Sequence, residues 1–474
     1  MLAAADLLSV VNEAYGIQER ERVELDVLRR YATGKQPLPL VIPADAPPEV
    51  REMARIARIN LVAIVLNSLT ESLYLDGLRT TEVDESGDQQ DVSLPVWDVW
   101  QANRLDRGQA GLYRATFTYG TAYMVVTAGR PVPVVRPVSP RAMTAVYGDD
   151  PDWPLFALER RRGGLWRLYD DTHVHTLKRD PDRGGWELAA EAAEHGLSYC
   201  PVIRYRDAED LDEEDEAPPL VPDARGGRAT QVVAGQVAPL MTLQDQADVT
   251  TFTLKSAEWY SAFRQRWIVG WTPENRTDKM RAGASQMWTF EENPEDVKLG
   301  EFSETTLDGY LRSREAVLKY AATLSQTPVH ELIGELVNLS AEALAAAEAG
   351  RDRKVELRKT GLGESHEQTA QAIGDLLGVD VPDDIQVVWR DTSARAFGAI
   401  VDGLGKLAQM LGIPQQELWD RVPGVTQQTV RRWKAVAAQG DALGNLTALL
   451  ERQAAGGGER VSAGGLILPP GVAA

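Results

Sequence analysis

Cysteine and histidine are scarce in this sequence. One cysteine, Cys200, and five histidines occur among its 474 residues. A single cysteine cannot form an intrachain disulfide, and so few residues supply no cysteine and histidine cluster for zinc. We therefore predict a cytosolic protein and exclude the small secreted domains that disulfides hold together.

Long hydrophobic runs are also absent. The most apolar run, Leu61 to Leu69, is far shorter than the ~20 residues that a membrane-spanning helix needs. The N-terminus lacks the basic stretch and the following apolar stretch of a secretion signal. The sequence therefore predicts neither secretion nor a membrane span.

Positive charge is in deficit. Lys and Arg number 50 against 70 Asp and Glu, which gives a formal net charge of −20. This charge argues against a protein that grips nucleic acid over its whole surface. With 43% apolar and 25% charged residues, the composition is that of a folded globular protein, and the length predicts roughly two to four domains.

Complete catalytic motifs are missing as well. The stretch from His330 to Ile333 begins like the helix of a zinc protease, but Gly334 stands where the second histidine would bind the metal. Gly405 and Lys406 resemble the end of a phosphate-binding loop, whose first glycine would fall on Ile400. No G-x-S-x-G motif anchors a nucleophile.

One metal-binding pattern stays open. Asp171, His173 and His175 alternate, so a strand would place all three on one face, where they could hold a metal ion. Half-exposed strand residues are the commoner explanation, and we prefer it. We therefore predict no catalytic residues, no metal and no cofactor, and an uncharacterised hydrolase is an alternative without support in the sequence.

The first half of the chain changes from helical to strand-like patterns. Residues 5–75 have helical spacing, with Ile56, Leu61, Ile64, Val65 and Leu69 near one face. The proline-rich stretch 37–48 interrupts this helix. From about 112 to 205, turns at 162–164 and 181–185 predict hairpins of an antiparallel sheet. The expected strands are 122–127, 132–135, 155–158, 165–168 and 173–177.

The second half is predicted to be mostly helical after a linker. The acidic and proline-rich composition of residues 208–228 predicts the linker, and the tail 454–474 is expected to be poorly ordered. Between them we first expect a long helix at 236–268 and a mixed segment at 269–302 with a strand-like run at 286–290. A second helix, capped by Ser303 and ending at Thr327, and a loop at 326–339 should follow. The last expected elements are a helix capped by Ser340 and ended or kinked at Gly361 and Gly363, a strand at 385–389 and a helix at 394–411.

Residues 413–436 resemble a helix-turn-helix. A helix that contains Gln415 to Leu418 precedes a second one, in which Arg431, Arg432 and Lys434 form a basic group. A DNA-binding regulator that uses these helices is the alternative function. A packed helix pair with a solvated basic face is the simpler explanation of the same residues.

The order of the predicted elements resembles that of bacteriophage portal proteins of the siphophage type. Five local stretches occur in the same order as in that family and cover about residues 55 to 400. They are Ala57–Leu61 through Leu73–Leu78, Trp100–Asp106 with the pattern W-x-x-N-x-L-D, Ala115–Tyr123 with the pattern Y-G-x-A-Y, Val138–Arg141, and the helix start Asn338–Leu344.

The resemblance implies a mixed α+β portal-like fold. Its parts would be a helical N-terminus, a wing that contains antiparallel strands, long stem helices, a small clip and a helical C-terminal crown. The implied boundaries are 1–225 for the wing, 226–268 for the linker and first stem helix, 269–302 for the clip, 303–325 for the second stem helix, 326–339 for the tunnel loop, 340–380 for a long kinked wing helix, and 381–474 for the crown and a flexible tail.

The resemblance also implies a structural role without enzymatic activity. Such a protein would form a ring, usually of about twelve subunits, at one capsid vertex of the virion, after assembly in the host cytoplasm. Double-stranded DNA would pass through its channel without sequence-specific binding during packaging and ejection. The implied partners are the terminase, which hydrolyses ATP, the head-tail adaptor, and the major capsid and scaffolding proteins.

The acidic composition suits such a channel. Each cation that closes on a phosphate releases counterions and adds affinity that would slow sliding, so a net negative wall favours passage. Within the implied tunnel loop, Gln326, Glu331, Glu335 and Asn338 would touch the duplex without gripping it. The apolar residues of that loop, Leu332, Ile333, Leu336 and Val337, are expected to pack against the neighbouring helices instead.

Overall fold

The computed structural model forms two compact units, Met1–Ala394 and Arg395–Ala474. It describes residues 4–79, 93–180, 184–207, 235–262, 266–269, 298–301, 306–334, 341–383, 385–390, 397–422, 425 and 427–440. Several predictions fall outside these residues: the linker 208–228, the strand-like run 286–290, the caps Ser303 and Ser340, and the tail 454–474.

Three helices form the N-terminal part: α1 (Ala4–Ala32), α2 (Pro48–Ile56) and α3 (Leu61–Glu71). The predicted proline-rich interruption separates α1 from α2. A second interruption, between α2 and α3, was not expected from the sequence. It arises at Asn60, whose side chain accepts a hydrogen bond from the backbone nitrogen of Ala63 at 3.0 Å and so caps α3.

The helix α3 is a core helix. Its residues Leu61, Val65 and Leu69 are buried, as their helical spacing predicted, whereas Ile56 lies on α2 and is 46% exposed. The stretch Pro48–Glu71 is long and apolar enough by composition to cross a membrane. The break between α2 and α3 and the burial of the α3 side chains explain this composition by packing inside the protein.

The helices α4 (Ser93–Ala102) and α5 (Leu105–Tyr119) come before the sheets. The strand-like region therefore begins later than the predicted residue 112. The helix α5 ends at Gly120, which has a φ of 81°, a left-handed conformation that glycine adopts without steric cost.

All strand pairings in the described residues are antiparallel, as predicted. One sheet has the order β10-β2-β3, and another has the order β4-β5-β6-β7-β8 with β9 paired to β7. Their strands are β2 (Thr121–Thr127), β3 (Val134–Val138), β4 (Met143–Tyr147), β5 (Pro154–Arg160), β6 (Leu165–Tyr169), β7 (His173–Arg179), β8 (Trp186–Leu188), β9 (Ala193–Glu194) and β10 (Val202–Arg206). The turn Arg162–Gly164 joins β5 to β6, as its two glycines predicted.

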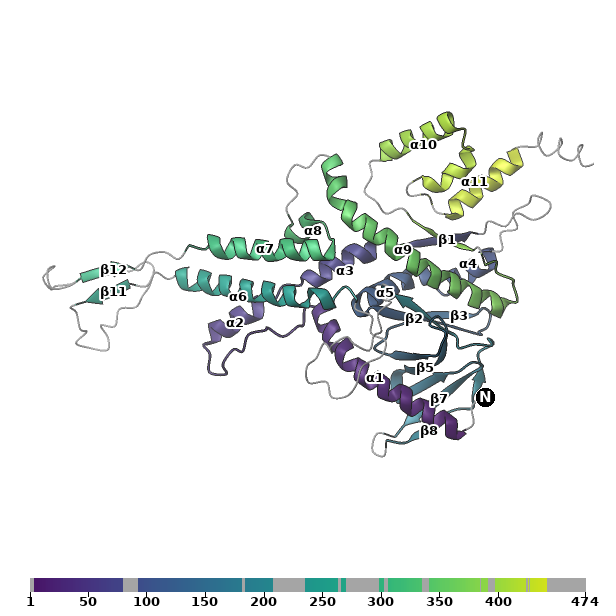
Figure 1. Cartoon of the computed structure of the whole chain (residues 1–474), viewed down its shortest axis with the longest axis horizontal. Helices are drawn as coiled ribbons and strands as arrows, with labels where there is room; N and C mark the ends of the chain where they lie inside the picture. The colour runs from purple at the N-terminus through teal and green to yellow at the C-terminus, as the bar shows by residue number, and fades with distance from the viewer. Residues whose placement is uncertain are drawn as a thin grey trace, which may run out of the picture. The chain divides into compact units, whose positions relative to one another are not determined.

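Two long helices pack against these sheets (Figure 1). The helix α1 contacts β4 and β5, and α9 (Ala341–Leu377) contacts β2 and β10. The main hydrophobic core joins the second half of α1 with α3, α4, α5, β2 and α9, and a smaller cluster joins the first half of α1 with β5, β6 and β7. The mixed α+β class is therefore confirmed.

The helix α9 does not end at Gly361 or Gly363, contrary to the first of the two sequence alternatives. It continues through both glycines to Leu377. A Cβ atom at Gly363 would lie 3.2 Å from Cγ2 of Val387, so the glycine lets the strand β13 (Gln386–Trp389) approach the helix closely. The strand β13 was predicted, but its antiparallel partner β1 (Leu75–Arg79) was not.

The helices α6 (Met241–Ala262) and α7 (Asp308–Ser325) are shorter than predicted. The expected continuation of α6 to residue 268 is wrong, because Trp267 belongs to the strand β11 (Arg266–Val269). The helix α7 begins at Asp308 rather than near Ser303. Its predicted end before Pro328 is confirmed.

The second compact unit contains helices. They are α10 (Phe397–Leu411), the 3-10 helix η5 (Gln415–Arg421) and α11 (Gln427–Gly440). The rings of Trp419 and Trp433 meet edge to face with centroids 6.0 Å apart, which joins η5 to α11.

Candidate functional site

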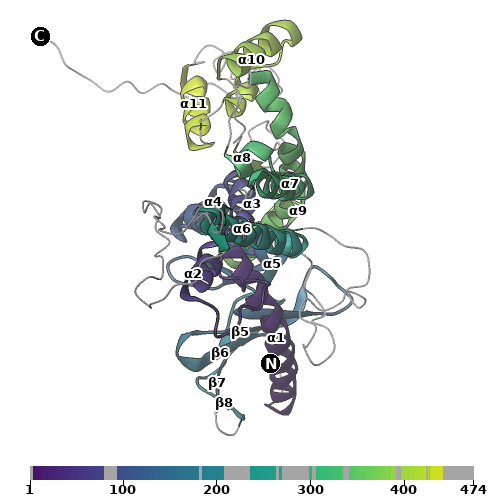
Figure 2. The same ribbon diagram turned by 90° about the vertical axis from the view of Figure 1, so that its left-hand side faces the viewer.

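The helices α6 and α7 form an adjacent pair (Figures 1 and 2). At one end of the pair the chain forms two short strands, β11 and β12 (Lys298–Glu301), which pair from Arg266 with Glu301 to Val269 with Lys298. At the other end, α7 leads into the residues predicted as the tunnel loop. The pair and this loop correspond to the segments that the sequence analysis assigned to the stem and the channel.

The N-terminal half of α6 is fixed by a buried carboxylate. Asp248 is fully buried and accepts hydrogen bonds from Nε2 of Gln36 at 2.8 Å, the backbone nitrogen of Ile59 at 3.0 Å and Nε2 of Gln244 at 2.9 Å. Burial raises the pKa of Asp248 above its ordinary value. Asp248 therefore holds α6 to Gln36, which precedes α2, and to Ile59, which precedes α3, through hydrogen bonds from uncharged donors.

A tight turn connects α7 to the residues predicted as the tunnel loop. Gln326 has a φ of 56°, a left-handed conformation that is uncommon for a residue other than glycine, and its side chain is exposed. The hydroxyl of Ser325 lies 3.0 Å from the hydroxyl of Thr327. A short helix, α8 (Val329–Ile333), follows and ends at Gly334, which has a φ of 77°.

The four residues predicted to touch DNA differ in what surrounds them. Gln326 is exposed at the turn, whereas Glu331 on α8 forms an ion pair with Arg351 of α9, with Oε1 2.6 Å from Nη1. Glu335 and Asn338 lie outside the described residues. The expected packing role of Leu332 is confirmed, because its side chain is only 7% exposed and belongs to the main core.

Sequence analysis missed a row of cations on α9 that holds this region. Arg351, Lys354 and Arg358 are separated by three and four positions, so they share one face of the helix. That spacing is present in the sequence, in a helix that is otherwise rich in alanine and glutamate. The partners of these cations come from other parts of the chain, which only the tertiary structure brings together.

Lys354 lies at the centre of this row. Its Nζ donates hydrogen bonds to the carbonyl oxygen of Ser325 at 2.9 Å and to Oε1 of Gln236. Nε2 of Gln236 also donates to Oδ2 of Asp207 at 2.5 Å, and Nε of Arg358 donates to Oδ1 of the same carboxylate at 2.8 Å. The end of α7 is thereby connected through α9 to the end of β10.

Burial shifts the pKa values in this network. It lowers the pKa of Lys354 to about 8, although Asp207 favours the charged form. It also raises the pKa of Asp207, against the opposing effect of Arg358. The charge of Asp207 therefore favours the charged form of Lys354, and the charges of Arg358 and Lys354 favour the charged form of Asp207.

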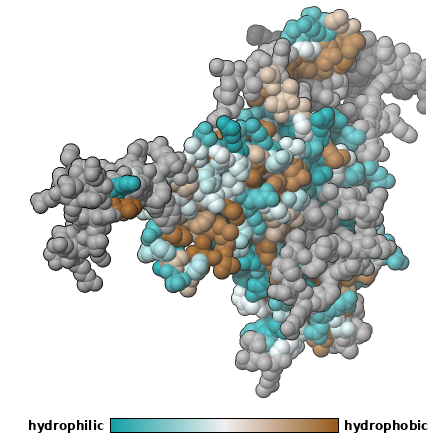
Figure 3. All heavy atoms as spheres, turned by 60° about the vertical axis from the view of Figure 1, so that its left-hand side comes forward, coloured by the Kyte–Doolittle hydropathy of each residue, from teal (hydrophilic) through white to brown (hydrophobic). Residues whose placement is uncertain are grey.

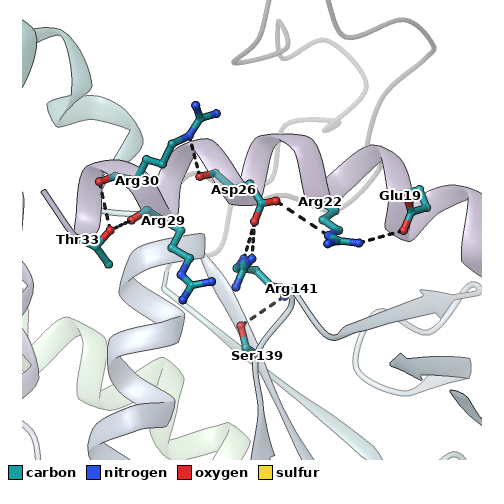
Figure 4. Close-up of polar contacts among 8 residues, drawn as sticks. All are labelled: Glu19, Arg22, Asp26, Arg29, Arg30, Thr33, Ser139 and Arg141. Carbon is teal, nitrogen blue, oxygen red and sulfur yellow. Dashed lines mark hydrogen bonds and ion pairs between the residues drawn. The ribbon is translucent and has the colours of Figure 1, made fainter. Parts of the chain in front are cut away.

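The motif Val138–Arg141 fixes α1 to the sheets. Arg141 follows β3, and its Nε and Nη2 atoms donate to Oδ1 of Asp26 on α1 at 2.8 and 2.5 Å (Figure 4). The backbone nitrogen of Arg141 donates to Oγ of Ser139 at 3.3 Å. This motif is therefore a connection between the N-terminal helix and the start of β4.

The W-x-x-N-x-L-D motif shapes the junction of α4 and α5. Oδ1 of Asp106 accepts hydrogen bonds from Nε1 of Trp100 and Nε2 of Gln101, both at 3.1 Å. Asn103 bonds to the carbonyl oxygen of Pro133 at 2.9 Å and the backbone nitrogen of Val135 at 3.0 Å. These polar residues position the helices beside β3.

The metal-binding pattern around His173 does not form a site. Nε2 of His175 is buried 2.9 Å from Oδ2 of Asp170, rather than facing Asp171, and Nδ1 of His173 lies 2.8 Å from the hydroxyl of Thr172. Among the described residues, no group of three or more His, Cys, Asp or Glu side chains could hold a metal ion. Cys200 is buried, and burial raises the pKa of its thiol.

The helix-turn-helix expectation is only partly matched. The first expected helix is the seven-residue 3-10 helix η5, and the second is α11, on which Arg432 and Lys434 are exposed. Because a 3-10 helix has poorer hydrogen-bond geometry and is used in short pieces, η5 differs from the first α-helix of that motif. The DNA-binding regulator gains no support from this geometry.

Comparisons with known proteins agree on one family. A family model described as phage portal protein, SPP1 Gp6-like, matches residues 15–441. The portal protein of Mycobacterium phage D29 is 24% identical over 393 residues, which cover 76% of this chain and 74% of the relative. The portal protein of Mycobacterium phage L5 is 24% identical over 400 residues, with coverages of 78% and 76%.

A solved structure of a gene transfer agent virion is also similar. One of its chains matches with a TM-score of 0.41 and 14% identity, over 78% of this chain and 91% of that chain. The family match spans residues of both compact units, including the helices α10 and α11. The chain therefore belongs to the phage portal protein family of the SPP1 Gp6 type, and it is a structural protein of the virion vertex through which DNA is packaged, not an enzyme.

Proposed function

We propose that about twelve copies of this chain form a ring in which the paired helices α6 and α7 are the stem. The observation that carries this proposal is the course of the chain along that pair. One end leads to the strands β11 and β12, and the other end leads through Gln326 into the loop before α9. Members of the portal family form oligomeric rings, which supports the same arrangement.

The proposed parts of the ring follow the chain. Residues 1–225 form the wing, 226–268 the linker and first stem helix, 269–302 the clip, 303–325 the second stem helix, 326–339 the tunnel loop, 340–380 the long wing helix and 381–474 the crown and tail. The helix bounds of α6, α7 and α9 fall inside the proposed segments and support this division.

The charge of the chain supports a channel that does not grip DNA. A ring of about twelve chains, each with a formal charge of −20, would carry roughly −240 charges and repel the duplex on average. In the tunnel loop, Gln326, Glu335 and Asn338 are the proposed polar contacts with the duplex. Glu331 contributes to the loop mainly through its ion pair with Arg351.

The proposed partners follow from the position of the ring at the capsid vertex. The terminase and then the head-tail adaptor would dock on the clip, and the major capsid and scaffolding proteins would surround the wing. Double-stranded DNA would pass through without sequence-specific contacts, and no membrane is involved.

Two measurements test this proposal. Negative-stain images of the purified chain should show rings with a central channel, and a monomer at all salt and protein concentrations would contradict the ring. Deletion of residues 326–339 should leave the rings intact but stop DNA packaging into capsids. The substitution Arg162→Gly, in an exposed turn of the wing, is the control that should package normally. Normal packaging by the deletion variant would refute the tunnel-loop assignment.

A further inference from the structure

The three cations on one face of α9 each bind a different part of the chain. Arg351 binds Glu331 on α8, with the two atoms 2.6 Å apart. Lys354 binds the carbonyl oxygen of Ser325 at the end of α7. Arg358 binds Asp207 beyond β10, with Nε 2.8 Å from Oδ1. One helix face therefore connects the stem, the start of the tunnel loop and the sheet.

Lys354 contacts Ser325 at the C-terminal end of α7, where a positive charge stabilises a helix most. The last carbonyl groups of a helix lack partners within the helix and carry the negative end of its dipole. Ser325 is the last residue of α7, and its carbonyl oxygen lies 2.9 Å from Nζ of Lys354. The next residue, Gln326, turns the chain with its left-handed backbone conformation.

The network around Lys354 also reaches the sheet. Gln236 accepts a hydrogen bond from the ammonium group of Lys354. Its backbone nitrogen donates to the carbonyl oxygen of Phe117 at 2.8 Å. Asp207 bonds through its backbone nitrogen to the carbonyl oxygen of Gly120 at 2.9 Å. Because both anchors are fixed to the region where α5 meets β2, the position of Ser325 is tied to the sheet and not only to α6.

A hydrophobic side chain could fill the position of Lys354 without the desolvation cost of a buried charge. Buried ionic groups often contribute little net stability compared with apolar residues of similar volume. Lys354 is half-buried, and this burial lowers the pKa of its ammonium group to about 8, because the charged form loses part of its hydration there. A role in positioning, rather than in stability alone, accounts for a lysine here.

We propose that Lys354 is a positioning residue that fixes the end of α7 and the adjoining tunnel loop relative to the sheet, with Arg351 fixing α8 beside it. The proposal rests on the proposed function of the loop as the part that meets DNA. Loss of Lys354 leaves the subunit folded and the ring assembled, but it releases the loop and impairs the passage of DNA.

The experiment compares full-length rings of the unmodified chain with Lys354→Met, Lys354→Arg and Arg353→Met. Arg353 is an exposed cation on the same helix, so its substitution is the matched control. Ring formation is measured by negative-stain microscopy, loop mobility by hydrogen exchange of residues 326–334, and packaging by the amount of nuclease-protected DNA in capsids.

The expected results separate positioning from stability. Lys354→Met should form rings at the normal yield, exchange residues 326–334 about tenfold faster and package about tenfold less DNA, the scale of one lost charge-assisted hydrogen bond. Lys354→Arg, which keeps a donor for Ser325, should recover packaging to within about twofold. Arg353→Met should behave like the unmodified chain in all three measurements.

Specific outcomes would overturn the proposal. Normal packaging by Lys354→Met, or loss of rings together with packaging, would show that Lys354 does not position the loop. If Lys354→Met does not fold, Glu331→Ala, which removes the acceptor of Arg351 and so releases the partly exposed α8, must lower packaging, and normal packaging by it overturns the proposal. Failure of the unmodified chain to form rings would instead refute the proposed function, which keeps the two failures distinct.

Discussion

The imidazole of His366 on α9 lies between two tyrosine hydroxyls, and its Nδ1 atom is 2.9 Å from the hydroxyl of Tyr205 on β10. Its Nε2 atom is 2.9 Å from the hydroxyl of Tyr113 on α5. A neutral imidazole has one donor and one acceptor, so one hydroxyl donates to it and the other accepts from it. His366 thereby joins α5, α9 and the sheet inside the main core.

This burial predicts a specific pH dependence of stability. Burial lowers the pKa of His366 to about 3, whereas the unfolded chain binds the proton near pH 6.5. The stabilising contribution is fully present above pH 6.5 and decreases as pH falls towards 3, because only the unfolded state takes up the proton in that range. Between pH 7 and pH 5, His366 should lower the free energy of unfolding by about 2 kcal/mol.

The measurement is urea unfolding at pH 7 and pH 5. The variant His366→Gln removes the titrating group, so its stability should fall less between these pH values than that of the unmodified chain. Equal slopes for His366→Gln and the unmodified chain would show that His366 does not carry this effect.

The buried carboxylate of Asp248 should be important for stability. The change Asp248→Ala leaves the backbone nitrogen of Ile59 without its acceptor and takes one acceptor from each of Gln36 and Gln244. The expected cost is about 3 kcal/mol of unfolding free energy, the scale of buried donors that lose their partners. Thermal unfolding measures it, and Thr253→Ala at an exposed position of the same helix should have little effect. A loss as small as that of Thr253→Ala would contradict the anchoring role.

The exposed apolar residues of α7 should matter for the ring. Tyr320 and Leu324 are 66% and 52% exposed in the single chain. Figure 3 shows one face of the molecule, on which apolar patches lie beside polar ones. If neighbouring stems cover these residues, Tyr320→Glu and Leu324→Glu should reduce ring formation, because a charge would be buried at the contact.

Light scattering and negative-stain images measure this effect. Because both side chains are exposed, the melting temperature of the monomer should stay within about 2 °C of the unmodified value. Rings at normal yield from both apolar variants would exclude this face of α7 from the subunit contact.

Local signals in the sequence determined much of the secondary structure. Helical spacing of apolar residues predicted α3, and glycines at Arg162–Gly164 predicted the hairpin of β5 and β6. These predictions succeeded because the causes are local: the periodicity of buried side chains and the backbone freedom of glycine. The order of the motifs similarly predicted the family, which the comparisons confirmed.

The tertiary structure alone decided the pairings between distant segments. The strand β1 pairs with β13, and Lys354 bonds to Ser325 and Gln236. The local sequence pattern of these segments does not indicate which distant segment each of them contacts. The alternation of Asp171, His173 and His175 predicted a shared face, but the carboxylate that meets His175 belongs to Asp170 in the turn before the strand. The sequence by itself shows that cysteine, histidine and positive charge are scarce. Only folding determined where the few basic residues of α9 act, because a hydrogen bond depends on the distance and direction between its atoms in space.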